Sequence, residues 1–204
     1  NLKNNIMIKQ LALLLLFCGS LSAQEKCDSD KSRAYQNELN KEYANKKTSP
    51  LTLTDLQDFK ELDFFKVDSR YCVTAKINLT ADAKPFMMQT TTDRSPMYIK
   101  YADLVFLIDG KEQTLEVYQS IKSASIDAFS TDLFLPFTDL TTGKESYSGG
   151  RYIDLQIPEG DFITLDFNRA YNPYCAYNSR YSCPLVPKIN HLEVAIKAGV
   201  KKFH

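Results

Sequence analysis

The sequence lacks tryptophan, has only two histidines, and shows no excess of charge of either sign. Its 25 basic and 25 acidic residues provide no positive field for a phosphate backbone, so nucleic acid is not an expected partner. His191 is the only histidine away from the end of the chain, and no spacing around it forms a convincing catalytic dyad. Twelve tyrosines and twelve phenylalanines supply the aromatic residues, which suits a β-rich core.

The sequence also lacks an apolar run long enough to cross a bilayer, which takes about 20 residues. The run Leu11–Cys18 is short, follows Lys9 and precedes a small residue at Ala23, as in an export signal. We therefore expect residues 1–23 to be a signal peptide, with extra residues before Met7, and the mature chain to be periplasmic or secreted. The alternative is a lipid anchor at Cys18, which the bulky Phe17 disfavours.

Removal of the signal would leave an even number of cysteines, as in a protein with disulfides. These are Cys27, Cys72, Cys175 and Cys183, which allow three pairings. Proximity favours Cys175–Cys183, and this leaves Cys27–Cys72 as the second bridge. A metal site that adds His191 and Asp166 to Cys175 and Cys183 is the weaker alternative, because the cysteine spacing is wider than usual for zinc. We expect no metal and no cofactor.

The hydrophobic pattern predicts a mainly β protein, either an antiparallel β-sandwich or a partly open barrel, with an N-terminal helical arm. Residues 28–45 have helical periodicity, and a capping box at Thr54 predicts a second short helix. We assign residues 24–65 to the helical arm and residues 66–204 to a single β-rich domain. Its strands are short and turns recur every 8–12 residues, which is typical of sandwiches and barrels.

Particular strands follow from local signals. Asp109-Gly110 between two apolar runs predicts a β-hairpin. We expect the strand at residues 133–135 to stop at Pro136, and further strands at residues 145–147 and 191–196. After the strand at residues 162–167 comes a long loop, 166–187, with four tyrosines: Tyr171, Tyr174, Tyr177 and Tyr181.

Several sequence blocks together resemble the bacterial family catalogued as domain of unknown function 1684. The most specific block is Asp166–Tyr177, and shorter ones are Leu135–Asp139 and Gly150–Ile153. The resemblance brings no established activity. It implies that one set of polar and cysteine positions belongs to the family pattern: Asp139, Arg151, Asp166, Asn168, Arg169, Tyr171, Asn172, Cys175, Cys183 and Asn190.

We interpret the polar members of this set as candidate ligand-binding residues. Arginine provides forked donors for carboxylate or phosphate, and asparagine provides a donor and an acceptor. The predicted function is a non-catalytic binding module for a small polar or carbohydrate ligand. Internal pairing of the same residues, with the loop as a structural staple of an envelope protein, is the alternative. A hydrolase with Asp139 or Asp166 as acid or base is another, since Glu145 and Asp154 lie on neighbouring turns and strand ends.

Overall fold

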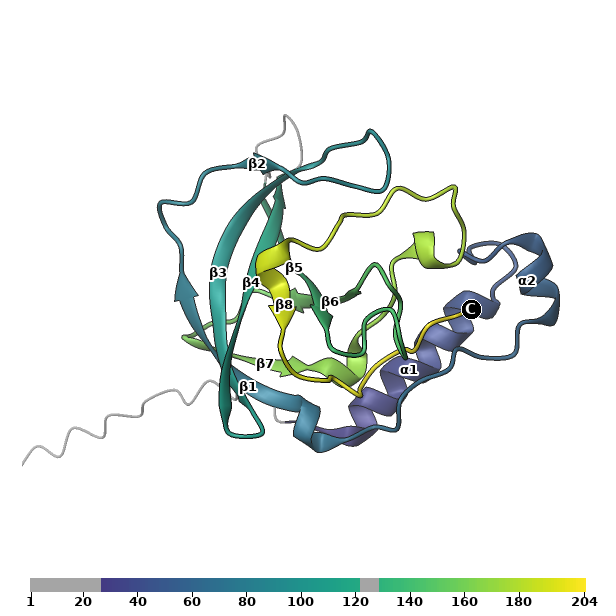
Figure 1. Ribbon diagram of the computed structural model, residues 1–204, viewed down its shortest axis with the longest axis horizontal. Helices are drawn as coiled ribbons and strands as arrows, with labels where there is room; N and C mark the ends of the chain where they lie inside the picture. The colour runs from purple at the N-terminus through teal and green to yellow at the C-terminus, as the bar shows by residue number, and fades with distance from the viewer. Residues whose placement is uncertain (1–26, 122–128) are drawn as a thin grey trace, which may run out of the picture.

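The computed structural model describes residues 27–121 and 129–204 (Figure 1). In this part of the chain an N-terminal helix packs against a curled, mainly antiparallel sheet, which confirms the predicted fold class. The predicted signal peptide over residues 1–23 lies outside the described residues. Within them, no helix is both long and apolar enough to span a membrane.

The helices and strands follow in the order of the chain. The two α-helices are α1 (Ser29–Ala44) and α2 (Leu53–Asp58), and single 3-10 turns are η1 (Ser69–Tyr71), η2 (Phe167–Arg169), η3 (Tyr174–Ala176) and η4 (Lys188–Asn190). The strands are β1 (Cys72–Leu79), β2 (Phe86–Met87), β3 (Met97–Ile108), β4 (Lys111–Ile121), β5 (Phe129–Asp139), β6 (Arg151–Gln156), β7 (Phe162–Asp166) and β8 (His191–Leu192).

The first helix begins where its sequence provides a cap. The Asp28 side chain accepts hydrogen bonds from the backbone amides of Asp30 and Lys31, at 2.8 and 3.4 Å. Cys27, directly before the cap, is bridged to Cys72 at the start of β1, as predicted. The second helix also forms, but its cap is Thr52 rather than Thr54, because the Thr52 hydroxyl accepts from the amide of Asp55.

The main sheet has the strand order β6-β5-β4-β3-β1-β7, and each of these strands is antiparallel to its neighbours. The predicted hairpin joins β3 to β4: Asp109 and Gly110 both have positive φ, 49° and 74°, as a type I′ turn requires. β2 extends the sheet at β3, and β8 pairs with β5 in parallel.

The two edge strands of this order, β6 and β7, are brought together by the chain that follows β7. Tyr171 and Tyr152 of β6 exchange two backbone hydrogen bonds, of 2.9 and 3.0 Å. The sheet therefore curls into a partly open barrel, the second of the two predicted arrangements (Figure 1). The loop that begins at Asp166 passes through this junction at Tyr171.

Three predicted strand limits are wrong. β5 continues through Pro136. The Pro136 carbonyl accepts a hydrogen bond from the Asn190 side chain and therefore faces away from β6. The nitrogen of Pro136, which carries no hydrogen, faces the same way, so no hydrogen bond to β6 is lost. Residues 145–147 form a turn instead of a strand, with two amides donating to the Thr141 carbonyl. The last strand is only β8, because after it the Val194 carbonyl accepts from the Leu140 amide and the Ile196 amide donates to the Asp139 carboxylate.

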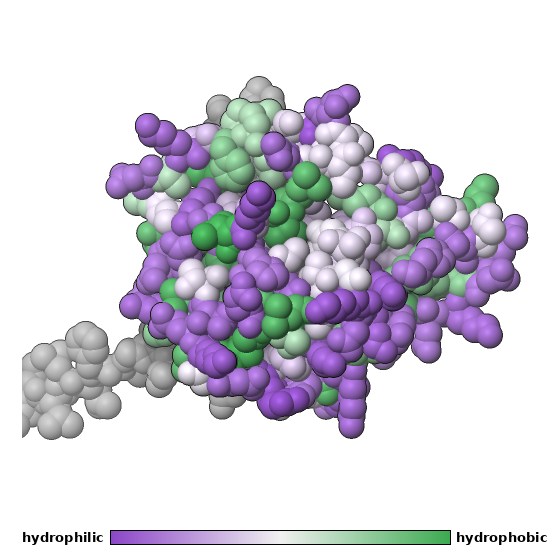
Figure 2. Space-filling view, in the orientation of Figure 1, coloured by the Kyte–Doolittle hydropathy of each residue, from purple (hydrophilic) through white to green (hydrophobic). Residues whose placement is uncertain are grey.

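Two apolar clusters stabilise the fold. The larger fills the curled sheet and includes Leu104, Leu115 and Leu165, all fully buried. The smaller joins α1 to the loop and the C-terminal segment through residues such as Tyr43 and Tyr177. On the face drawn in Figure 2, hydrophilic side chains cover most of the surface and apolar ones form small separate groups. α1 is thus held by a second apolar core that it shares with the loop and the C-terminal segment.

Candidate functional site

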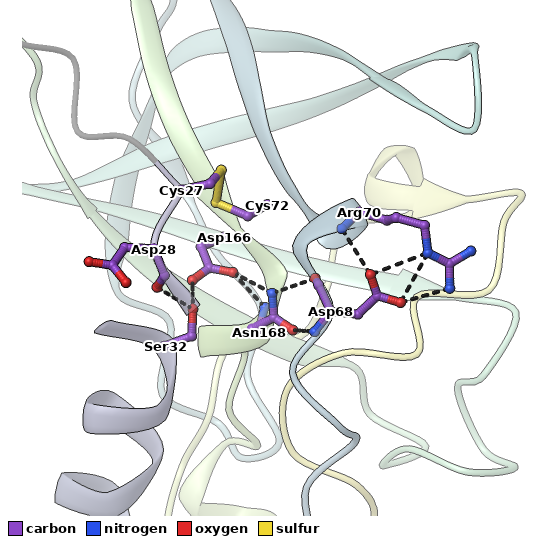
Figure 3. Close-up of a disulfide and its surroundings, with 8 residues drawn as sticks. All are labelled: Cys27, Asp28, Ser32, Asp68, Arg70, Cys72, Asp166 and Asn168. Atoms are coloured by element: carbon purple, nitrogen blue, oxygen red, sulfur yellow. Dashed lines mark hydrogen bonds and ion pairs between the residues drawn. A yellow bond between two sulfur atoms is a disulfide. The ribbon is translucent and has the colours of Figure 1, made fainter. Parts of the chain in front are cut away.

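Asp166 and Asn168, two of the predicted ligand-binding residues, lie at the start of the loop (Figure 3). The Asp166 carboxylate accepts from the Ser32 hydroxyl at 2.6 Å and from the Asn168 amide group at 2.8 Å. The Asn168 side chain also pairs with the backbone N–H and C=O of Asp68, each at 2.9 Å. Their polar atoms therefore connect α1, η1 and η2 to one another.

Arg151 and Asp139 form a second closed arrangement. Their side chains are fully buried, and Nη2 of Arg151 lies 2.7 Å from Oδ2 of Asp139. The same guanidinium donates to the backbone carbonyls of Ile196, at 2.9 Å, and Ala198. Burial lowers the pKa of Arg151, and the Asp139 carboxylate opposes this shift. The pair therefore links the segment after β8 to β5 and β6. None of the guanidinium nitrogens of Arg151 faces solvent.

The remaining candidates divide into buried and half-buried residues. Asn172 donates to the Lys201 carbonyl, and Asn190 bonds both backbone groups of Glu116. Arg169 is half-buried and stacks over the Tyr35 ring, while the Tyr171 hydroxyl bonds Asp154. We use the term buried polar set for the six candidates that are buried and bonded internally: Asp139, Arg151, Asp166, Asn168, Asn172 and Asn190.

The predicted bridge between Cys175 and Cys183 is not formed, and both thiols are free. The chain between them folds through η3 so that the backbone N–H of Cys175 donates to the sulfur of Cys183 at 3.2 Å. A hydrogen bond from the Cys183 thiol lowers the pKa of Cys175 to about 7, whereas that same bond raises the pKa of Cys183. His191 instead contacts Thr138 and Glu193, so it provides no base to this pair.

The sequence had raised a metal site with Cys175, Cys183, His191 and Asp166 as a weaker alternative. In the structure Asp166 is bonded to Ser32 and His191 to Thr138, so the four do not gather. Across residues 27–121 and 129–204, no three histidine, cysteine or acidic side chains are grouped so that they would hold a metal ion.

An open cavity of about 350 Å³ lies where the loop faces α1 and the sheet. Its volume falls at the lower end of the range for small-molecule sites, roughly 300–1,000 Å³. We call it the tyrosine cavity, because seven of its lining residues are tyrosines. It is lined by Tyr35, Leu39, Glu42, Tyr43, Tyr98, Phe134, Tyr152, Asp154, Tyr171, Pro173, Tyr174, Tyr181, Ser182, Cys183 and Pro184.

The rings of the tyrosine cavity stand at steep angles to one another. Phe134 and Tyr152 have centroids 4.7 Å apart and planes at 75°, and Tyr152 and Tyr171 meet at 89°. Tyr174 and Tyr181 form a third, tilted pair with centroids 5.2 Å apart. Edge-to-face pairs of this kind are favourable contacts, and they fix the orientation of the walls.

Two carboxylates are held at the cavity by phenols. The Tyr171 hydroxyl donates to Asp154 and the Tyr174 hydroxyl to Glu42, both at 2.8 Å. Loss of surrounding water raises the pKa of Asp154, and the bond from Tyr171 opposes this. Burial, aided by the bond to Glu42, raises the pKa of Tyr174 to about 12, so this ring stays a neutral phenol at physiological pH.

The structure thus brings together one predicted candidate, Tyr171, with residues that the sequence assigned to packing. Tyr35 and Tyr43 lie in the segment 28–45 with helical periodicity, and Tyr98 and Phe134 were counted only among the aromatic residues of a β-rich core. The available signal was the cluster of tyrosines in the loop, three of which line the cavity: Tyr171, Tyr174 and Tyr181. Their partners come from α1, β3, β5 and β6, which no local pattern relates.

The fold and the site define a curled antiparallel β protein whose loop after β7 closes an aromatic cavity against an N-terminal helix. The family model described as "Protein of unknown function (DUF1684)" matches residues 57–201, and the chain belongs to this family. This confirms the resemblance found in the sequence. The match begins after α1, which provides four of the lining residues.

A solved structure shares the fold. The solution NMR structure of the uncharacterized protein from gene locus rrnAC0354 of Haloarcula marismortui is 36% identical, with a TM-score of 0.66. The match covers 84% of this chain and 92% of that chain. No curated protein matches this chain. The comparisons therefore establish family and fold, and bring no activity with them.

Proposed function

We propose that this protein is a non-catalytic binding module whose ligand site is the tyrosine cavity. The observation that carries the proposal is an open space of about 350 Å³ with seven tyrosines and two carboxylates in its lining. Ligand sites are typically concave, mostly apolar or aromatic, and supplied with a few convergent polar groups. In this proposal the loop and β6 contribute to the site, and tyrosines replace the buried polar set as the ligand-facing groups.

Burial separates this proposal from the predicted pocket around Arg151 and Asn172. Tyr35, Tyr98 and Tyr171 are only half-buried, so each keeps part of its ring accessible. Arg151 and Asn172 have no exposed surface. Arg151 donates to the Asp139 carboxylate and to backbone carbonyls, and Asn172 donates to the Lys201 carbonyl. A ligand could reach them only after these bonds break, which costs the full desolvation of the groups left behind.

The hydrolase alternative finds no support in the cavity. The Asp139 carboxylate pairs with Arg151, and the Asp166 carboxylate accepts hydrogen bonds from Ser32 and Asn168. Neither aspartate lines the tyrosine cavity. We propose an exported location, periplasmic or secreted, because the Cys27–Cys72 disulfide suits an oxidising compartment. The purely structural envelope protein is the alternative that a ligand test must exclude.

The test is a thermal-shift screen of small sugars, carboxylates, amines and quaternary ammonium compounds. A ligand at 100 times its Kd should stabilise the folded state by about 2.7 kcal/mol. The informative pair of variants is Tyr98→Ala and Tyr101→Ala, since both residues are half-buried on β3 but only Tyr98 lines the cavity. We expect the ligand-induced shift to disappear in Tyr98→Ala and to persist in Tyr101→Ala.

Two outcomes contradict the proposal. One is a ligand that stabilises both variants as it stabilises the unmodified protein, which would place its site elsewhere. The other is no shift with any compound class, which would favour the structural protein.

A further inference from the structure

We propose that the tyrosine cavity is selective for a small organic cation, such as a quaternary ammonium group. This rests on the proposed function and names its ligand class. Among the described residues that line the cavity there is no lysine, arginine or histidine, while Glu42 and Asp154 are acidic. A cation that enters therefore meets two carboxylates and no fixed positive charge in the lining.

The ring arrangement matches the shape of such a ligand. Recognition of quaternary ammonium groups uses the negative faces of aromatic rings, with the cation within about 6 Å of each ring centroid. Phe134, Tyr152 and Tyr171 follow one another at 75° and 89°, so successive walls turn their faces in different directions. A set of crossed walls surrounds a tetrahedral cation better than a flat ring system, which stacks on parallel faces.

Three of the seven tyrosine hydroxyl groups that line the cavity donate their protons within the protein. Tyr152 donates to the Pro184 carbonyl, Tyr171 to Asp154 and Tyr174 to Glu42. A sugar depends on free donors and acceptors around its hydroxyls, and three of the phenols have already committed their protons. What they leave to a ligand is ring face, and a phenol that donates to a carboxylate has a more electron-rich ring. Both effects favour a cation over a neutral sugar.

The protein itself places cations on rings of this cavity. The Arg169 guanidinium lies 4.8 Å from the Tyr35 centroid, and that of Arg180 lies 4.7 Å from the Tyr181 centroid. Neither arginine is among the lining residues. They show that the aromatic faces in this region already accept a positive group, and no lysine or arginine of residues 27–121 and 129–204 is recorded over the rings of Phe134 and Tyr152.

The experiment compares choline with 3,3-dimethylbutan-1-ol, which has the same shape without the charge. Both are titrated into the full chain at constant salt, and binding is followed by NMR shifts or calorimetry. We expect choline to bind at least roughly tenfold tighter, because cation–π contacts and a nearby carboxylate stabilise bound choline but not the bound neutral alcohol. Equal affinity for the two compounds would overturn the inference.

Variants locate the charge that is responsible. Asp154→Asn keeps the shape of the side chain and should weaken choline binding several-fold, without changing the binding of the neutral alcohol. Asp161→Asn is the matched control: it removes the same charge from an exposed carboxylate outside the cavity and should leave choline binding unchanged. If both variants weaken choline binding equally, the effect is one of net charge and the inference fails.

A glucose and maltose titration separates this inference from the proposed function. Sugars that bind in a Tyr98-dependent manner while choline does not would reject the cation and retain the cavity as a binding site. Absence of binding by cations and sugars alike, together with a silent screen, would reject both.

Discussion

The buried polar set and the tyrosine cavity both draw residues from the 166–187 loop, where Asn172 directly follows Tyr171, and they use their residues in opposite ways. Arginine, aspartate and asparagine, the residue types expected to meet a ligand, are buried and bonded to backbone groups. Tyrosines, the type expected to fill a core, open into a cavity. The difference teaches that the strongest hydrogen-bonding side chains in and around this loop satisfy buried backbone groups of the segments that pack against it.

The comparison also distinguishes two cysteine pairs. Cys27 and Cys72 form a disulfide that fixes the start of α1 to β1, next to Asp166 and Asn168 (Figure 3). Cys175 and Cys183 remain thiols, and Cys183 lines the tyrosine cavity. Covalent fastening is thus found beside the buried polar set, whereas the cavity wall is held by hydrogen bonds and ring contacts.

The largest expected effect comes from breaking the pair at the centre of the buried polar set. Arg151→Met leaves the Asp139 carboxylate buried without its partner and removes donors from the carbonyls of Ile196 and Ala198. The free energy of unfolding should fall by about 3–5 kcal/mol, measured by urea denaturation. Lys41→Met, which removes an exposed ion pair with Glu38, is the control and should cost under about 1 kcal/mol. Similar losses in both variants would show that burial of the pair has no special role.

Removing the disulfide should have the next largest effect. The double variant Cys27→Ser with Cys72→Ser releases a bridge that spans 45 positions, and we expect a loss of about 2–4 kcal/mol in chemical unfolding. Changing Cys175 and Cys183 to serine should cost less, because no covalent bond is lost. An equal loss in the second pair would indicate that it too is bridged in the folded protein, and thiol counting under denaturing conditions would decide this.

A smaller effect is expected at the junction of α1, η1 and η2. Asn168→Ala removes the bonds to the N–H and C=O of Asp68 and one donor to Asp166. Leaving such groups unsatisfied costs about 1–3 kcal/mol, to be measured by thermal or urea unfolding. Asn178→Ala, at a half-buried asparagine later in the loop, is the matched control. An Asn168→Ala protein as stable as the control would contradict the staple role of the loop.

The last prediction concerns the free thiols of Cys175 and Cys183, and the change it tests leaves the stability of the protein nearly unchanged. Because the bond from the Cys183 thiol lowers the pKa of Cys175 to about 7, its thiolate fraction should rise through half near this pH. Alkylation by iodoacetamide, corrected for the reagent with a free thiol, should therefore reach half its maximal rate near pH 7. Cys183→Ala, which removes the donor, should move this midpoint upward, towards the ordinary value of a thiol; an unchanged midpoint would assign the shift to another group.

Much of the architecture could be predicted from local signals, each with a physical cause. Asp28 caps α1 because its side chain reaches the first free amides, and Asp109-Gly110 turns the hairpin because both residues accept positive φ. The continuation of β5 through Pro136 could not be predicted, because it requires the nitrogen of Pro136, which carries no hydrogen, to face away from β6. The position of the Asn190 side chain against that strand decides this, and Asn190 lies 54 residues away.

The candidate site shows the same limit more sharply. The sequence by itself determined the family, the β-rich class and the helical arm, because caps, turns and periodicity are local. Cysteine parity indicated disulfides, but only the structure decided that Cys27–Cys72 forms while Cys175 and Cys183 stay free. Only the tertiary structure decided that Arg151 is enclosed and that Tyr35, Tyr98, Tyr152 and Tyr174 share one space. The reason is that burial and enclosure depend on the curl of the sheet, which places strands and a helix from distant positions around the same loop.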